Sequence, residues 1–481
     1  MSLQRIQQFA ILLLGLAVSH CFAAPPTASS AVKKNSNTNP RRTSAAPNII
    51  LILADDLGWG DLGCQGQTRF RTPHLDRLAA SGLRFTQAYA GNTVCAPSRC
   101  ALMTGLHSGH GRVRSNIQVP LEPDDVTLAE VLKSGGYRCA GVGKWALGWE
   151  GTSGHPNRQG FEDWFGYLDQ SHAHDYYPSF LWRNEIRFTN WRNSTGDRVE
   201  YAPDWFARFA TNYVQVHEDH PFFLYVASTF PHANNELGLN GMEVPSQGSY
   251  ASESWPAPEK GKAAMIERLD QLVGVIVQEV AKRQLTQQTL ILFSSDNGPH
   301  SESGVDATFF KSSGPFRGIK RSLYEGGLRV PLIASWPGHI APGTTNTLPV
   351  ALWDLLPTLA EIAKTTVPKG LDGVSFAPAL FGRDTLPRSS GLYWESHEDG
   401  YAQAVRFDNW KAIRSEIKGP VELYDLSKDS GETLNIAAQN PMRVAQAIQR
   451  MTDSADPWQT PKSLSIAPKQ FWQSAKEALP Q

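Results

Sequence analysis

Two short acidic stretches carry the side chains that a hard metal ion prefers. Asp55 and Asp56 follow one apolar run, and Asp296 and Asn297 follow another run much later in the chain. Carboxylate and amide oxygens are the ligands that Ca²⁺ prefers in proteins. An adjacent Asp-Asp pair alone more often marks a turn or a helix start, but a second pair at the end of another strand favours a shared site. The four side chains therefore predict a calcium site.

Alternating strands and helices must position these pairs. The continuous apolar run Asn48 to Ala54 is typical of a strand that is buried on both faces. Further strands are predicted at Tyr137 to Val142, Pro221 to Ser228, Thr289 to Ser295 and Val330 to Trp336, and helices at Thr72 to Ala80, Thr127 to Ser134, Lys262 to Lys282 and Leu352 to Ala363. This alternation predicts an α/β fold with a large, mainly parallel sheet and helices on both faces. Ligands bind at the carboxyl ends of the strands in such a sheet.

The densest motif is Cys95-Ala96-Pro97-Ser98-Arg99, continuing to Thr104-Gly105. It resembles the signature of the formylglycine-dependent sulfatases, the arylsulfatase type within the alkaline phosphatase-like superfamily. Similar companion stretches follow the order of that family and extend the resemblance over about Asn48 to Asn440: Leu53 to Gly58, Gly143-Lys144-Trp145, Pro231-His232, Ser295 to Gly298 and Phe316 to Gly327.

The resemblance implies hydrolysis of sulfate monoesters. In the family a maturation enzyme oxidises the motif cysteine, here Cys95, to formylglycine; one hydroxyl of its hydrate attacks sulfur, and the other, once deprotonated, expels sulfate. A plain thiol would hold the transferred sulfate with no easy exit. The resemblance also implies Ca²⁺ on Asp55, Asp56, Asp296 and Asn297, Arg99 beside the hydrate, Lys144 and Lys320 on the sulfate oxygens, and His232 as the proton donor to the leaving alcohol.

One position departs from the family pattern. Many sulfatases have a histidine two residues after the motif lysine, in GKWHLG, and this histidine is a candidate base for sulfate release. The chain has Ala146 there, which cannot ionise. Another group, for which His300 is the nominee, or a water must take over, or the enzyme is impaired.

Substrate choice is indicated by a loop rich in histidine and aromatic residues. The stretch Gln170 to Asn184 includes His172 and His174, and its rings and polar edges suit a sugar. An aromatic loop packed on the sheet explains the same composition equally well. Arg114, after the cysteine motif, could meet a further sulfate or carboxylate. A sulfated carbohydrate is the predicted substrate.

Composition excludes several other classes of protein. The chain of 481 residues has 45 Lys and Arg against 46 Asp and Glu, a formal net charge of −1, with 41% hydrophobic residues. These values are ordinary for a globular protein and supply no broad field for nucleic acid, so an anionic ligand needs a focused site. A two-zinc site is disfavoured because the acidic pairs lack histidine partners.

Both ends of the chain differ from its centre. Residues 1–24 show the charged start, apolar core and small-residue exit of a signal peptide, and 25–47 form a predicted flexible leader. We expect a secreted or periplasmic protein without a transmembrane segment; lipid anchoring at Cys21 is disfavoured because His20 fits a lipidation motif poorly. Residues 48–390 are the predicted catalytic domain, and the short strands and turns of 391–481 predict a C-terminal antiparallel-sheet subdomain.

These observations predict an exported, calcium-dependent sulfatase that acts on carbohydrates in glycan degradation. Two alternatives remain open. A phosphodiesterase or phosphonate hydrolase could share the fold, because phosphate and sulfate esters have the same tetrahedral anionic geometry. A non-catalytic protein that binds sulfated glycans is the other, and Ala146 is the feature that supports it.

Overall fold

The computed structural model describes residues 46–457, apart from 118, 384–390, 399 and 417. The predicted signal peptide, Cys21 and nearly all of the predicted leader lie outside the described residues. The predicted boundary at residue 390 also lies outside them, so these expectations remain predictions. Among the described helices, none has the length and apolar character that a membrane span requires.

Within the described residues, ten strands form one central sheet. They are β1 (Asn48–Ala54), β2 (Leu83–Phe85), β4 (Arg138–Lys144), β5 (Asp163–Tyr167), β6 (Phe180–Arg183), β7 (Ile186–Thr189), β8 (Phe222–Ala227), β9 (Thr289–Ser295), β10 (Leu332–Ser335) and β11 (Thr344–Asn346). Their spatial order is β11-β2-β10-β9-β1-β8-β4-β5-β6-β7. The central strands β9, β1, β8, β4 and β5 are parallel, whereas β10 and β6 run antiparallel to their neighbours. The predicted mainly parallel sheet is confirmed.

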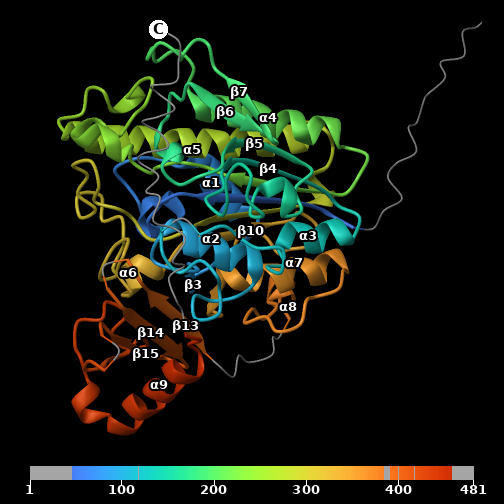
Figure 1. Ribbon diagram of the computed structural model, residues 1–481. Helices are drawn as coiled ribbons and strands as arrows, with labels where there is room; N and C mark the ends of the chain where they lie inside the picture. Colours follow the sequence, from blue (N-terminus) through green and yellow to red (C-terminus); the bar gives the residue numbers. More distant parts are fainter. Residues whose placement is uncertain (1–45, 118, 384–390, 399, 417, 458–481) are drawn as a thin grey trace, which may run out of the picture. The chain divides into compact units, whose positions relative to one another are not determined.

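Helices cover both faces of this sheet, which explains why β1 is apolar at every position but its first. One face of β1 presents Ile49, Leu51 and Leu53 to a core beneath α2 (Cys95–Thr104), α3 (Leu128–Ser134) and α7 (Leu355–Ala363). The other face joins the core beneath α1 (Pro73–Ala80), α4 (Ala202–Val216) and α5 (Ala257–Lys282). Figure 1 shows the two helix layers on opposite sides of the strands.

The helix starts differ slightly from the sequence prediction, for local reasons. Thr72 is the N-cap of α1 and Pro73 its first helical residue, a position where proline loses no hydrogen bond. Thr127 caps α3 through its side chain, which accepts from the Glu130 backbone N–H. Helix α5 begins at Ala257, earlier than the predicted Lys262, because Pro258 is tolerated in the first turn.

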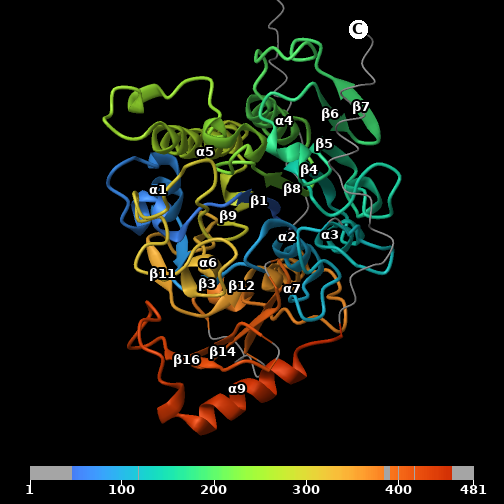
Figure 2. The ribbon, with the colours of Figure 1, turned by 60° about the vertical axis from the view of Figure 1, so that its left-hand side comes forward.

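The C-terminal part forms a second, antiparallel sheet, as predicted. Its strands are β13 (Leu392–Ser396), β14 (Ala402–Phe407), β15 (Trp410–Arg414) and β16 (Glu422–Asp425), with α9 (Pro441–Asp453) against β14. Trp394 and Ile413 pack on Tyr89 and Trp353 of the main part. Figure 2 shows this sheet between α9 and the small pair β3 (Ala88–Tyr89) and β12 (Val350–Ala351). The short helices α6 (Glu325–Leu328) and α8 (Ala377–Leu380) complete the described helical elements.

A buried charge cluster also joins the two sheets. The Lys411 ammonium on β15 lies 2.9 Å from Glu325 Oε1 in α6 and 3.0 Å from Glu432 Oε1, and all three side chains are fully buried. Arg329 pairs with the other oxygen of Glu325 through Nε at 2.8 Å. The C-terminal sheet therefore supplies a countercharge to the main part of the molecule.

Candidate active site

The two acidic pairs meet because their strands are neighbours. Strands β1 and β9 pair in parallel with Ala54 opposite Ser295, so both pairs leave the sheet at the same edge. The Asp56 N–H donates to Asp296 Oδ1 at 3.1 Å, and Asn297 Nδ2 donates to Asp56 Oδ1 at 2.6 Å. Asp56 has a φ of 64°, a left-handed conformation that is uncommon for a residue other than glycine and is concentrated at functional sites.

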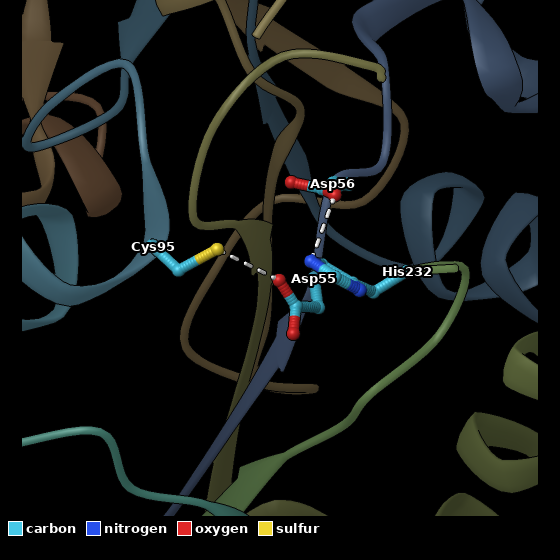
Figure 3. Close-up of side chains that lie close together, drawn as sticks. All are labelled: Asp55, Asp56, Cys95 and His232. Atoms are coloured by element: carbon cyan, nitrogen blue, oxygen red, sulfur yellow. Dashed lines mark hydrogen bonds and ion pairs between the residues drawn. The ribbon is translucent and has the colours of Figure 1, made fainter. Parts of the chain in front are cut away.

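Cys95 begins α2 and points into this edge of the sheet. Its Sγ donates to Asp55 Oδ1 at 3.3 Å, and Figure 3 shows the thiol directed at the Asp55 carboxylate with His232 and Asp56 alongside. Complete burial, and then the nearby Asp55 charge, raise the pKa of the Cys95 thiol well above its ordinary value. A thiol held protonated is a poor nucleophile.

Three buried cations compensate the carboxylates. Arg99, one turn after Cys95, donates to Asp296 Oδ2 through Nε at 3.1 Å and Nη2 at 2.8 Å. The Lys144 ammonium, at the end of β4, lies 2.7 Å from Asp55 Oδ2. The Lys320 ammonium lies 2.8 Å from Asp56 Oδ2. Arg99 and Lys144 are completely buried and Lys320 is 6% exposed, so these pairs are shielded from solvent.

The carboxylates of this site lie close enough together to shift one another's pKa. Burial alone would raise the pKa of Asp55, but Lys144, His232 and Arg99 hold it well below its usual range. For Asp296, burial and the adjacent Asp55 charge outweigh Arg99 and raise the pKa to about 7. Four carboxylates, Asp55, Asp56, Asp296 and Glu302, face four cations at this edge, Arg99, Lys144, Lys320 and the partly exposed Arg321. The raised pKa of Asp296 shows that these carboxylates are crowded together, an arrangement that an added cation would stabilise.

The donor set fits a calcium ion. Asn297 Oδ1 is buried and has no hydrogen-bond partner among the described residues, although its amide nitrogen donates to Asp56 and to the Gly298 carbonyl. A buried amide oxygen without a partner is rare in folded proteins. Together with the oxygens of Asp55, Asp56 and Asp296 it offers the hard ligands that Ca²⁺ binds.

His232 is held as a neutral acceptor beside Lys320. Its Nδ1 donates to the Ala233 carbonyl at 2.6 Å, and its Nε2 lies 3.2 Å from the Lys320 ammonium. Burial and the Lys320 charge lower the pKa of His232 well below its ordinary value. The Lys320 proton is therefore shared with an imidazole lone pair in the site, which is a suitable place for proton transfer.

Comparison with known proteins identifies this arrangement. The sequence profile of the Sulfatase family matches residues 47–365, and that of the N-sulphoglucosamine sulphohydrolase C-terminal region matches residues 317–455. Human arylsulfatase A is 34% identical over 463 residues, covering 84% of this chain and 87% of that protein. The chain belongs to the sulfatase family. The enzyme is therefore a sulfuric ester hydrolase.

A bacterial sulfatase and a solved structure are similar to this chain over most of its length. The N-acetylgalactosamine-6-O-sulfatase of Bacteroides thetaiotaomicron is 28% identical, covering 88% of this chain and 95% of that protein. The crystal structure of Ps i-CgsB in complex with k-i-k-neocarrahexaose superposes with a TM-score of 0.77 at 27% identity, covering 90% of this sulfatase and 98% of that chain. The predicted family and its fold are confirmed.

Glu302 belongs to the site of this sulfatase but was missed by sequence reasoning. Its carboxylate lies 3.2 Å from the Lys320 ammonium and 2.9 Å from Arg321 Nη1. Burial would raise its pKa, but Lys320 and His232 lower it to about 2, so Glu302 is ionised at neutral pH. Its only signal in the sequence is a position shortly after Asp296 and Asn297.

Of the two histidines predicted to bind substrate, His174 lies beside the site and His172 is packed in the interior. The His174 ring stacks on His232 at 4.7 Å, and its Nδ1 lies 3.2 Å from the Glu236 carboxylate, so His174 adjoins the site. The buried His172 ring packs between Tyr167 and Phe180, and burial lowers its pKa to about 3. The predicted role of His172 is untested, and its packing matches the alternative in which the loop lies on the sheet.

Arg114 and His300 are both engaged by the protein itself. Arg114 Nη1 donates to Glu395 Oε1 at 2.8 Å and to the Asp456 carbonyl at 2.9 Å, which ties it to the C-terminal part. His300 Nε2 donates to the Pro231 carbonyl at 3.1 Å, and its Nδ1 accepts from the Glu302 N–H at 3.0 Å. Their predicted roles toward substrate remain predictions.

Ala146 follows β4 with a φ of 67°. Its N–H donates to the Leu168 carbonyl at 2.9 Å, which holds this left-handed residue in place. The side chain contributes no titratable group, as the sequence indicated.

Proposed function

We propose that this sulfatase is an exported, calcium-dependent enzyme that hydrolyses sulfate monoesters on carbohydrates, with a formylglycine derived from Cys95 as its nucleophile. The observation that carries this proposal is the convergence of Cys95 with buried cations and a crowded set of oxygen ligands. Cys95 donates to Asp55, and Asp55 also pairs with Lys144, so the nucleophile position and the ligand set share one carboxylate.

The proposed calcium ligands are the two pairs at the ends of β1 and β9: Asp55, Asp56, Asp296 and Asn297. When bound there, Ca²⁺ supplies the positive charge that polarises the nucleophile and the sulfate group. The partnerless Asn297 oxygen and the raised pKa of Asp296 support this assignment.

We assign the nucleophile, the compensating positive charge and the proton donor to different residues of the chain. Formylglycine at position 95 supplies a hydrated aldehyde whose second hydroxyl, once deprotonated, expels the sulfate. Arg99 and Lys144 hold positive charge on the side of Asp296 and Asp55. On the side of Asp56, the Lys320 ammonium and His232 Nε2 share a proton at 3.2 Å and form the proposed source of the proton for the leaving alcohol.

The base for sulfate release has two candidates. One is His300, whose two ring nitrogens are both hydrogen-bonded to backbone groups. A water is the alternative base, because Ala146 has no ionisable group at the position where many members of the family have a histidine.

Carbohydrate substrates are supported by the neighbourhood of the site and by similar proteins. His174 stacks on His232 and presents an imidazole at the site. The similar proteins include an N-acetylgalactosamine-6-O-sulfatase and a protein crystallised with a neocarrahexaose. Export is supported by the signal-peptide pattern of residues 1–24.

The mass of the tryptic peptide spanning residues 85–99 tests the nucleophile. Conversion of Cys95 to formylglycine makes this peptide lighter by about 18 Da, a constant of the chemistry. An unmodified peptide from the native host, combined with no turnover of any sulfate ester, would favour the non-catalytic glycan-binding protein. Comparing 4-nitrophenyl sulfate with bis(4-nitrophenyl) phosphate separates a sulfatase from a phosphodiesterase. A sulfatase that cleaves aryl sulfates but no sulfated sugar would refute the carbohydrate assignment.

A further inference from the structure

Two hollows adjoin each other at Trp59 and Pro315, outside the residues that converge on Cys95. The first has a volume of about 590 Å³, and Arg69, Phe309 and Lys311 also line it. The second has a volume of about 400 Å³ and extends toward the C-terminal sheet. Its lining includes Arg329, Arg406, Asn409 and Ser430. Trp59 and Pro315 line both hollows, so together they form one surface, which we call the Trp59 groove.

The Trp59 groove concentrates positive charge. Four cations and no carboxylate are among the residues that line its two hollows: Arg69, Lys311, Arg329 and Arg406. The whole chain, by contrast, has a formal net charge of −1. A local excess of one sign in a concave surface attracts ligands of the opposite charge.

The carboxylates behind the second hollow do not cancel this charge. Glu325 pairs with Arg329, and Lys411 lies between Glu325 and Glu432. With Arg406, this buried cluster has three cations and two carboxylates. Arg329 and Arg406 belong to the lining itself, so one positive charge is left over at the second hollow.

Two residues that line the groove have buried donors without partners among the described residues. Arg406 is 3% exposed; its Nη1 donates to the Tyr89 hydroxyl at 2.8 Å, but its Nε has no hydrogen-bond partner among the described residues. The indole Nε1 of Trp59 has none among them either. Buried donors without partners are rare and call for a ligand or a water.

The first hollow combines aromatic faces with a fixed guanidinium group. Arg69 lies over the Phe309 ring at 3.9 Å and donates from Nη1 to the Phe309 carbonyl at 2.9 Å, while its side chain remains exposed. Trp59 packs edge-on against Phe316 at 5.2 Å. Sugar rings pack on aromatic side chains, and guanidinium groups bind tetrahedral anions through paired donors.

We propose that the Trp59 groove is a second binding surface for a sulfated oligosaccharide, separate from the catalytic centre. The choice of a sugar as ligand rests on the proposed function. The groove would hold a length of sulfated glycan beside the enzyme, which raises the affinity for long substrates and leaves the chemical step unchanged.

Calorimetric titration of the full chain with sulfated neocarrahexaose tests this proposal, using Cys95→Ala to prevent turnover. Lys311→Gln removes an exposed cation, and Ser430→Glu places a carboxylate at the second hollow. We expect each change to raise Kd by about threefold, the size of an exposed charge pair. Lys282→Gln, which removes an equally exposed cation elsewhere, and Ser430→Gln, which adds bulk without charge, should leave Kd unchanged.

Three further results decide the matter. Desulfated neocarrahexaose should bind at least tenfold more weakly, and inorganic sulfate should not reproduce the affinity of the hexasaccharide. Absence of hexasaccharide binding, an unchanged Kd in both groove variants, or equal binding of the desulfated sugar would overturn the proposal. In the active enzyme, Lys311→Gln and Ser430→Glu should leave the turnover of 4-nitrophenyl sulfate unchanged. A parent enzyme inactive toward every sulfate ester would instead count against the proposed function.

Discussion

Replacing Lys411 by methionine should destabilise the protein strongly, because it breaks a buried ion cluster from one side. The Lys411 ammonium lies 2.9 Å from Glu325 Oε1 and 3.0 Å from Glu432 Oε1, and none of the three side chains reaches solvent. In the variant, Glu325 keeps Arg329 as its partner, but Glu432 loses its only cation within salt-bridge distance among the described residues. Removing one member of a buried pair costs about 3–5 kcal/mol, and we expect the free energy of unfolding to fall by that amount.

Urea denaturation monitored by tryptophan fluorescence measures this loss of stability. A double-mutant cycle with Glu432→Gln tests whether the loss comes from the uncompensated Glu432 carboxylate. Burial already raises the pKa of Glu432, so Glu432→Gln alone should cost about 1 kcal/mol or less. Combining Lys411→Met with Glu432→Gln should recover about 2 kcal/mol relative to the sum of the single changes, because the uncompensated carboxylate is then absent.

The pH dependence of the Lys411→Met variant gives a second readout. Without the ammonium, the folded-state pKa of Glu432 moves further above its unfolded value, so the native state binds more protons between those two values. The variant should therefore become more stable relative to wild type as the pH falls through that window. A loss below about 1 kcal/mol, strict additivity in the cycle, or the opposite pH trend would refute the assignment of a buried charge penalty.

Three further predictions concern the catalytic site. Glu302→Gln should lower kcat for 4-nitrophenyl sulfate about tenfold with little change in KM, because Glu302 orients Lys320 by a charged hydrogen bond. An unchanged kcat would show that Glu302 has no role in the catalytic site. Tyr176→Phe should lower kcat several-fold and the free energy of unfolding by about 1 kcal/mol, because the Tyr176 hydroxyl donates to the Thr229 and His232 carbonyls. Steady-state kinetics and urea denaturation measure these two effects. Full activity of the variant would show that the two hydrogen bonds do not position His232. Dialysis against a calcium chelator should abolish activity, and Ca²⁺ should restore it better than Mg²⁺, because the four proposed ligands, Asp55, Asp56, Asp296 and Asn297, are carboxylate and amide oxygens. Activity that survives complete chelation would count against the metal assignment.

The sequence alone was enough to predict the central sheet and to predict that the pairs Asp55-Asp56 and Asp296-Asn297 lie close together. The runs Asn48 to Ala54 and Thr289 to Ser295 are apolar at their central positions because helices cover both faces of their strands, and each is followed by one of the two pairs. Once both are central parallel strands, the two pairs must leave at the same edge. Sequence alone did not show that Asp56 takes a left-handed conformation, because nothing in its local pattern requires it.

Other features depend on contacts between distant segments that leave no local pattern. Lys411 and Glu432 are ordinary charged residues in sequence, and only the packing of the C-terminal sheet buries them together. The loop containing His172 and Tyr176 was predicted either to bind sugar or to pack on the sheet. Both rings are buried, and the Tyr176 hydroxyl is bonded to backbone carbonyls. Composition could not decide this, because aromatic side chains suit both environments.

The position of Cys95 limits when its proposed conversion to formylglycine could take place. Its side chain is 0% exposed, it lies in the first turn of α2, and its Sγ is already bonded to Asp55. The folded protein does not present this thiol at its surface, so an enzyme that carries out the proposed conversion would reach Cys95 only before α2 packs against the sheet. The proposed modification would therefore compete in time with folding. A molecule that folds first would keep an inert thiol, and slower folding of this region would increase the fraction of active enzyme.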